Sequence, residues 1–137
     1  MNSPVVELAC IIDDDNVYVN LVKKIIETKK LCENLIVFSD GKQSIDYFEA
    51  LLQNLDPTNI PEIIFLDLNM PIMDGWEFLE RFTKIKNRLD KAITLYVVSS
   101  SINPLDVNRA KALSSVKDYL IKPVNIDELE NIFSAKV

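Results

Sequence analysis

The chain has 137 residues, a formal net charge of −6 and no histidine. A chain of this length forms one ordinary domain, and its apolar runs are far shorter than the roughly 20 residues that cross a bilayer. It lacks the concentration of lysine and arginine that phosphate-backbone binding needs, which argues against nucleic acid. Without histidine, serine–histidine catalysis and imidazole-bound zinc are excluded. We therefore expect a cytoplasmic domain without membrane contact, whose chemistry uses carboxylates, lysine and hydroxyls.

The first predicted strand leads directly into a run of acids. Glu7 to Ile12 is apolar and is followed by three aspartates, Asp13 to Asp15. Asp15 or Asn16 can cap the helix that comes next. Capping requires one acid, so the other two aspartates remain unexplained. The helix is predicted from apolar residues at helical spacing, namely Tyr18, Leu21, Val22, Ile25 and Ile26.

A second strand and helix follow. Leu35 to Phe38 is the strand, and Ser39-Asp40-Gly41 is a turn into the helix. The segment from Asp56 to Pro61, which contains two prolines, is predicted to be a surface connection. The inner face of the helix is expected to carry Ile45, Phe48, Leu51, Leu52 and Leu55.

The stretch from Glu62 to Gly75 organises the rest of the chain. Its first half is a short apolar run, typical of a strand buried on both faces of a parallel sheet, and the run ends at Asp67. Met70-Pro71 keeps a helix from starting at once, and Asp74-Gly75 is a turn signal before one. The loop therefore holds Asp67 at the rim of a sheet. The inner face of the helix that follows is predicted to contain Phe78, Leu79, Phe82, Ile85 and Leu89.

The fourth strand, Ile93 to Val98, ends at a run of serines that begins with Ser99. Asn103 and Pro104 then supply the N-cap and first position of a helix that extends to about Leu113. This helix should be the least firmly held, because its apolar face is thin and consists of Val107, Ala110 and Leu113.

The last strand, Lys117 to Ile121, ends at Lys122-Pro123. Asn125 is placed to cap the final helix, and Glu128 occupies the capping-box position. Val124 and Leu129 are predicted to form the hydrophobic staple of that helix, with Ile132 and Phe133 buried behind them.

Five strands alternate with five helices, which predicts a parallel sheet covered on both faces by right-handed crossovers. In such folds the ends of the strands meet at the carboxyl edge, where ligands bind. The polar residues at these ends are Asp13, Asp14, Asp67, Ser99 and Lys122.

This set of side chains permits a specific chemistry. Neighbouring carboxylates repel by roughly 4 kcal/mol per pair at about 4 Å and an effective dielectric constant of about 20, so a cation must be present or some must be protonated. Oxygen ligands without sulfur or imidazole favour Mg²⁺, with Mn²⁺ possible. Lys122 suits a phosphoryl or carboxylate oxygen, and Ser99 adds a hydroxyl donor. In this setting Asp67 can attack phosphorus and become an acyl phosphate.

Four ordered motifs together resemble the receiver domain of two-component response regulators across essentially the whole chain. They are Ile11 to Asp15, Phe65 to Gly75, Val98 to Ser100, and Tyr119 to Pro123. The resemblance implies a flavodoxin-like α/β fold, a three-layer doubly wound five-stranded parallel sheet with strand order 2-1-3-4-5. It also implies a stand-alone receiver over residues 1–137 without an output domain. Such a protein is a signalling protein with intrinsic phosphotransfer and autodephosphorylation chemistry rather than an enzyme.

The resemblance also implies a role for each site residue. Asp67 is the phosphoacceptor, and Mg²⁺ is bound by Asp14, Asp67 and the backbone carbonyl of Asn69, with Asp13 acting through water. Lys122 is the ionic partner of the phosphoryl group and its bond to Pro123 is cis. Ser99 follows the phosphoryl group, and Tyr119 is the aromatic switch.

A chain without histidine must take its phosphoryl group from a sensor histidine kinase, a histidine phosphotransfer protein or a small phosphodonor. An unidentified downstream protein would read the face formed by the helix from Pro104, the strand after it and the last helix. Signal output, relay and phosphate sink remain open alternatives. A flavodoxin-like electron carrier is disfavoured because acids stand where its flavin phosphate would bind. A magnesium-dependent aspartyl phosphatase would need an aspartate where Asn69 stands.

Overall fold

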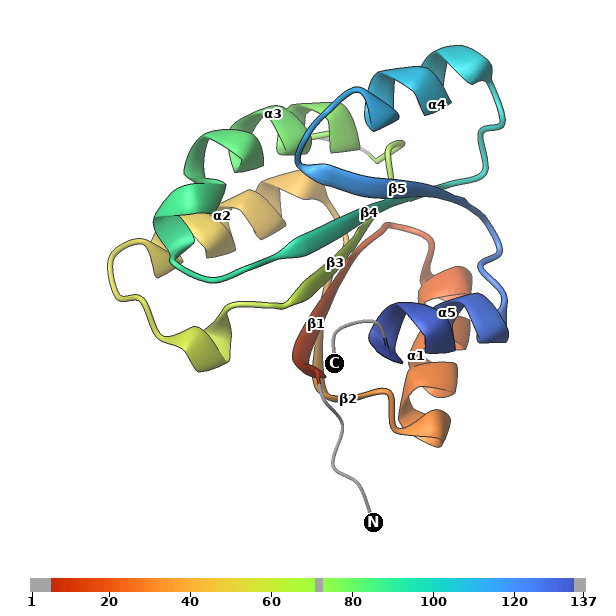
Figure 1. The fold of residues 1–137 in the computed structure, drawn as a ribbon, viewed down its shortest axis with the longest axis horizontal. Coiled ribbons are helices and arrows are strands. Elements are labelled where there is room, and N and C mark those ends of the chain that lie inside the picture. Colours follow the sequence, from red (N-terminus) through yellow and green to blue (C-terminus); the bar gives the residue numbers. More distant parts are fainter. Residues whose placement is uncertain (1–5, 71–72, 135–137) are drawn as a thin grey trace.

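Residues 6–70 and 73–134 are described by a computed structural model of the chain (Figure 1). They form a five-stranded sheet with all strand pairs parallel and the strand order β2-β1-β3-β4-β5. The predicted order 2-1-3-4-5 is therefore confirmed. The strands are β1 (Val6–Ile12), β2 (Cys32–Phe38), β3 (Ile63–Leu66), β4 (Thr94–Ser99) and β5 (Val116–Ile121).

Helices cover both faces of this sheet (Figure 1). On one face lie α1 (Asn16–Lys29) and α5 (Ile126–Ser134). The other face is covered by α2 (Gly41–Leu51), α3 (Gly75–Ile85) and α4 (Pro104–Lys111). Two 3-10 helices, η1 (Pro57–Asn59) and η2 (Lys86–Leu89), lie in the connections before β3 and β4. Within the described ranges, no helix is long and apolar enough to cross a membrane.

Each face of the sheet has its own apolar core. The α1/α5 side contains Val22, Phe65 and Phe133, and the α2/α3/α4 side contains Phe48, Phe78 and Phe82 among others. The inner strands β1, β3 and β4 are mostly buried between these cores, as expected for a parallel sheet, whereas the edge strands β2 and β5 carry exposed polar residues. β3 is buried along its whole length, which confirms its predicted central position.

A polar side chain caps the start of every α-helix. In each case a side-chain oxygen accepts a hydrogen bond from a backbone N–H of the first turn, which leaves fewer donors unsatisfied. The predicted caps Asp15, Asn103 and Asn125 are confirmed. The full set, with acceptor distances, is Asp15 to Tyr18 at 3.1 Å, Asp40 to Gln43 at 2.8 Å, Asp74 to Glu77 at 2.9 Å, Asn103 to Leu105 at 3.0 Å and Asn125 to Glu128 at 2.7 Å.

Three leucines predicted on inner helical faces are exposed instead. Leu21, Leu55 and Leu113 are 54%, 43% and 37% exposed. Leu55 and Leu113 lie beyond the ends of α2 and α4, so helical spacing no longer turns them toward the sheet. Leu21 lies outside the buried stripe of α1, which consists of Val19, Val22 and Ile26.

Two other predictions differ in detail from the structure. β2 begins at Cys32 rather than at Leu35. The connection predicted to lie on the surface is only partly exposed, because Ile60 is buried in the α2/α3/α4 core. The predicted effect of Met70-Pro71 cannot be compared, since residues 71–72 lie outside the described residues.

Candidate functional site

Three carboxylates meet at the carboxyl edge of the sheet. Asp13 and Asp14 follow β1, and Asp67 follows β3, its neighbour in the sheet. One carboxylate oxygen from each residue lies within 4.8 Å of the others. Asp13 and Asp67 are buried, at 2% and 6% exposure, whereas Asp14 is exposed. The sequence prediction that these acids converge is confirmed.

Backbone hydrogen bonds fix the positions of the two buried acids. The Asp13 N–H donates to the Phe38 carbonyl, and the Asp67 N–H donates to the Ile12 carbonyl, both at 2.9 Å. These bonds continue the sheet ladder one residue past each strand. The Asp13 carboxylate also accepts from the Asp15 N–H at 2.9 Å. The carboxylates are therefore held together by the backbone despite their like charge.

Lys122 supplies a positive charge to this cluster. Its Nζ lies 2.8 Å from Asp13 Oδ2 and 3.9 Å from Asp67 Oδ2, and its side chain is 14% exposed. The Lys122 N–H donates to the Ser99 carbonyl at 2.9 Å. The Lys122–Pro123 peptide bond is cis, as the resemblance implied. Lys122 thus contacts Asp13 directly and stands within reach of Asp67.

The environment of Asp67 disfavours its charge. Burial and the Asp13 carboxylate raise the pKa of Asp67 from 3.8 to about 6, while Lys122 and a backbone hydrogen bond from Asn69 act in the opposite direction. A cation beside the three carboxylates would relieve this strain on the ionised form. All the side chains of the cluster offer hard oxygen ligands, which fits Mg²⁺ or Mn²⁺.

Ser99 and Tyr119 form the other half of the predicted site. Ser99, fully buried at the end of β4, accepts a hydrogen bond at Oγ from the Ser101 N–H at 3.1 Å. Tyr119 on β5 is 7% exposed, so its ring points inward, and its hydroxyl donates to the Ser101 carbonyl at 2.9 Å. The two residues are therefore joined through Ser101, and the backbone bond from the Lys122 N–H to the Ser99 carbonyl connects them to the acidic cluster.

Two residues near Asp67 were not predicted as part of the site. A side-chain carbon at Gly75 would press against the Asp67 carbonyl oxygen and lie 2.7 Å from Leu68 Cα. Only glycine fits this close approach of α3 to the acceptor loop. Tyr18, predicted as a core residue, has its ring centre 4.7 Å from Lys122 Nζ. The sequence signal was its place in the first turn after the acidic run.

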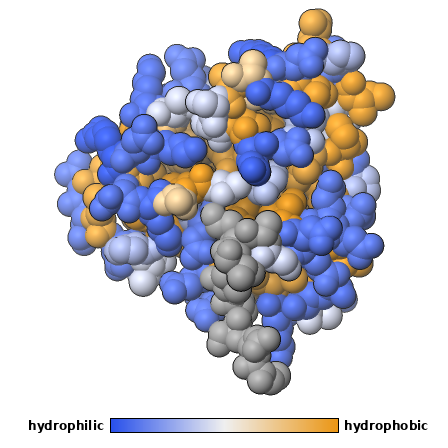
Figure 2. Space-filling view, viewed as in Figure 1, coloured by the Kyte–Doolittle hydropathy of each residue, from blue (hydrophilic) through white to orange (hydrophobic). Residues whose placement is uncertain are grey.

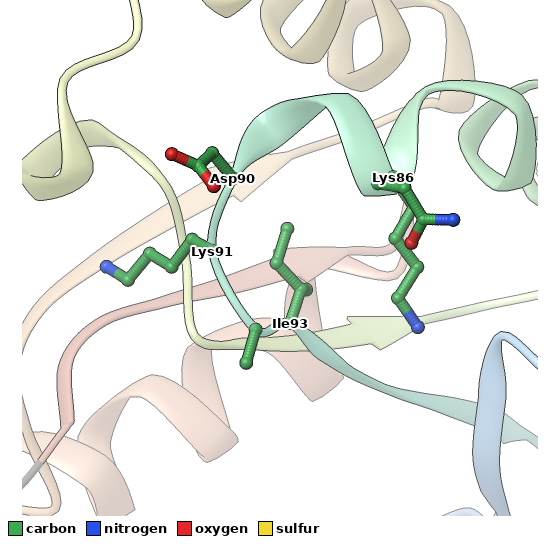
Figure 3. Close-up of a pocket in the computed structure, with 6 residues that line it drawn as sticks. Lys86, Asp90, Lys91 and Ile93 are labelled. Carbon is green, nitrogen blue, oxygen red and sulfur yellow. The ribbon is translucent and has the colours of Figure 1, made fainter.

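A depression at the opposite edge of the sheet has a structural explanation (Figure 3). It lies before β4, and Lys86 and Lys91 extend to opposite sides of Ile93 (Figure 3). Lys91 Nζ donates to the carbonyls of Pro57 and Ile60 at 2.7 and 2.8 Å. It also lies 3.8 Å from a carboxylate oxygen of Glu62. Lys91 therefore fastens the connection before β3 to the one before β4.

Comparison with curated proteins gives two relatives similar along most of this chain. A probable methanogenesis regulatory protein, FilR2, from Methanothrix harundinacea is 30% identical over 120 residues, which cover 88% of this chain and 74% of the relative. The response regulator Rcp1 from Synechocystis is 31% identical over 120 residues, which cover 87% of this chain and 78% of Rcp1.

Solved structures show the same fold. A two-component response regulator from Cytophaga hutchinsonii has a TM-score of 0.83 at 27% identity, with 96% of each chain covered. The Mn²⁺-bound form of Rcp1 has a TM-score of 0.70 at 26% identity, covering 94% of this chain and 90% of that one. The family model for the response regulator receiver domain matches residues 9–134. This chain therefore belongs to the family of response regulator receiver domains.

Proposed function

We propose that Asp67 accepts a phosphoryl group from the phosphohistidine of a sensor histidine kinase or histidine phosphotransfer protein, in a Mg²⁺-dependent reaction. The observation that carries this proposal is the buried Asp67 carboxylate, grouped with Asp13 and Asp14 and 3.9 Å from Lys122. Receiver domains are signalling proteins that take phosphoryl groups from such partners. These 137 residues contain no histidine, so the phosphohistidine must lie outside them.

The metal would be held by Asp14, Asp67 and the Asn69 carbonyl, with Asp13 acting through water. When bound, it would supply positive charge that offsets repulsion among the acids and the phosphoryl oxygens. Mg²⁺ is the expected ion, and Mn²⁺ should substitute because it accepts the same oxygen ligands.

The reaction would use the chain's own groups as follows. An Asp67 carboxylate oxygen attacks phosphorus, and the bond from phosphorus to the donor's imidazole nitrogen breaks with its electron pair left on nitrogen. Lys122, 2.8 Å from Asp13, would swing toward an oxygen of the new acyl phosphate. The Ser99 hydroxyl accepts one hydrogen bond and still carries a proton that it can donate to a second phosphoryl oxygen. Hydrolysis of the acyl phosphate would later restore Asp67.

The α4-β5-α5 surface would carry the signal to a downstream protein. Hydrophobic side chains reach the surface at the upper right of Figure 2, where Figure 1 places the start of α4. Ile102 and Leu105 there are 76% and 77% exposed. Movement of Ser99 toward a phosphoryl group would disturb its bond with Ser101, to which the Tyr119 hydroxyl is attached. The proposed switch thus runs from Ser99 through Ser101 to β5 and α4.

Acetyl phosphate with Mg²⁺ tests the acceptor assignment. Intact mass should show one added phosphoryl group that hydroxylamine removes and that a metal chelator prevents from forming. Asp67→Asn should abolish the gain, whereas Asp46→Asn, a change at an exposed acid on α2, should not. An acid-stable phosphate on the Asp67→Asn variant would refute the proposal.

Separate variants test the roles of the neighbouring groups. Asp14→Ala should weaken metal binding, while Lys122→Ala should leave metal binding largely intact and impair phosphoryl transfer. Equal loss of Mg²⁺ affinity in both variants would contradict these roles. For the switch, beryllofluoride should perturb amide NMR signals from Ser99 to Lys122 far more than those from Tyr18 to Lys29.

A further inference from the structure

Tyr18 is fixed beside the carboxylate cluster from two directions. Its backbone N–H donates to Asp15 Oδ1 at 3.1 Å, the cap that starts α1. Its hydroxyl lies beside the backbone of Val124, two residues beyond Lys122. Its half-buried ring packs against the core of the α1/α5 side. Tyr18 therefore links the first turn of α1 to the connection that carries Lys122.

The ring of Tyr18 is one wall around the Lys122 ammonium. Nζ lies 4.7 Å from the ring centre, 2.8 Å from Asp13 and 3.9 Å from Asp67. The ring's face attracts a cation by its quadrupole, and the attraction grows when the cation is shielded from water. Lys122 is 14% exposed, so this condition is met.

We propose that Tyr18 is a positioning residue for Lys122, whose ring steadies the ammonium while it passes from Asp13 to a phosphoryl oxygen on Asp67. This inference rests on the proposed function of Asp67. A lysine has a long, flexible stem, so the ammonium could otherwise turn to water when it leaves Asp13. The attraction of a ring face is less directional than a salt bridge, so Lys122 can move across it without losing the contact.

The ring, rather than the hydroxyl, is the part of Tyr18 that acts on Lys122. Burial raises the pKa of Tyr18 to about 12, so the hydroxyl remains protonated in neutral solution and is not a base. Phenylalanine keeps the ring and should preserve the function, whereas leucine keeps only apolar bulk and should not.

The test measures phosphorylation by acetyl phosphate at saturating Mg²⁺. Tyr18→Leu should slow the reaction roughly threefold to thirtyfold, the range for a shielded cation–ring contact. Tyr18→Phe should stay within about twofold of wild type, because the ring contact is retained. Mg²⁺ affinity should be unchanged in both variants, since Tyr18 offers the metal no ligand. Leu21→Ala, a change at an exposed position one turn along α1, should react at the wild-type rate.

A double-mutant cycle separates positioning from a general structural effect. If Tyr18 acts through Lys122, Tyr18→Leu should cause no further slowing in a Lys122→Ala background. Equal slowing in both backgrounds, a wild-type rate for Tyr18→Leu, or equal loss in Tyr18→Phe would each overturn the proposal. Should Tyr18→Leu fail to fold, Tyr18→Met gives the same comparison.

The placement of Lys122 can be tested without phosphorylation. The ring should shift the NMR signals of the Lys122 Cε protons upfield in wild type and Tyr18→Phe, and this shift should vanish in Tyr18→Leu. An unchanged shift in Tyr18→Leu would overturn the inference. A wild-type chain that takes no phosphoryl group on Asp67 but shows the ring shift would refute the proposed function and leave the ring contact established.

Discussion

Helices α3 and α4 cover the same face of the sheet, and each follows a strand with a site residue at or just after its end, yet they are held very differently. α3 follows the loop of Asp67 and buries Gly75, Phe78, Leu79, Phe82 and Ile85. In α4, whose residues are all described, only Ala110 is buried. The helix after the acceptor is anchored in the core, while the helix after Ser99 rests on the surface. The predicted thin apolar face of α4 is confirmed.

This contrast gives the two sides of the site different mechanical properties. Segments with few buried apolar contacts open at lower free energy than core segments. We therefore expect Asp67 to be held rigidly before α3, while α4 can move in response to a phosphoryl group on Asp67. The link between the two helices is itself at the surface, where the Arg109 guanidinium lies 4.0 Å from the centre of the Trp76 ring.

The largest difference should appear when each helix loses one apolar side chain. Phe82→Ala removes a fully buried ring and should cost about 3–5 kcal/mol of unfolding free energy. Leu105→Ala in α4, at 77% exposure, should change it by less than about 0.5 kcal/mol. Urea denaturation measures both values. Similar losses in the two variants would show that α4 is anchored as firmly as α3.

Ionisation of Asp67, which lies on the loop before α3, should lower the stability of the folded state. Its pKa is raised from 3.8 to about 6, so the folded state binds the proton more tightly and stability falls as pH rises from about 4 to about 6. At 1.36 kcal/mol per pKa unit, the loss above pH 6 is about 3 kcal/mol. In chelator, Asp67→Asn should therefore be more stable than wild type at pH 7.5 by up to this amount.

Denaturation at several pH values tests this expectation. The advantage of Asp67→Asn should close as pH falls to about 4, where the wild-type carboxyl is protonated when folded, and it should shrink when Mg²⁺ is added. Glu33→Gln, at an exposed position on β2, serves as the control. A pH-independent gain in Asp67→Asn would mean that ionisation of Asp67 is not its cause.

A methyl group at Gly75 should disturb the acceptor loop through overpacking. It would press on Asp67 and Leu68, so Gly75→Ala should destabilise the fold by about 1–3 kcal/mol. The largest changes in amide NMR signals of this variant should lie at Asp67 and Leu68. Asn108→Ala, at an exposed position in α4, should have almost no effect on stability. If Gly75→Ala left the free energy of unfolding unchanged, the backbone at Asp67 and Leu68 would have to move aside at little cost.

The smallest change in unfolding free energy should come from removing the contact between Arg109 on α4 and Trp76 on α3. Arg109→Ala removes the contact with Trp76 and should cost about 0.5–1 kcal/mol, the range for exposed cation–ring contacts. Trp76 is the only tryptophan in the chain, so its fluorescence reports the change directly. Arg88→Ala, a change at an exposed arginine in η2, is the matched control. An unchanged spectrum in Arg109→Ala would mean that the contact does not persist in solution.

The sequence was sufficient to predict where the site lies. Polar residues that end separate parallel strands must meet at one edge, so Asp13, Asp67 and Lys122 converge by topology alone. Helix caps were also predictable, because a side chain such as Asn125 acts on a backbone N–H only a few residues away. Both kinds of prediction depend on local pattern and strand direction.

Contacts between side chains from different elements could not be predicted in the same way. Helical spacing places Tyr18 on α1 but does not show that its ring meets Lys122, which depends on the course of the chain after β5. Nor does it show that Lys122 contacts Asp13 more closely than Asp67. The exposure of Leu55 depends on where α2 ends, which periodicity fixes poorly.

The Lys91 fastening at the opposite edge has a consequence for chemical footprinting. Reagents that acylate amines need an accessible, unprotonated nitrogen, and Lys91 Nζ must first release the Pro57 and Ile60 carbonyls. Lys91 should therefore label more slowly than Lys86, which extends from the other side of the same depression (Figure 3). The ratio of the two yields would report opening of the connections before β3 and β4, at a place remote from the phosphoacceptor. Labelling of Lys91 relative to Lys86 would thus show whether the connections before β3 and β4 stay joined during signalling.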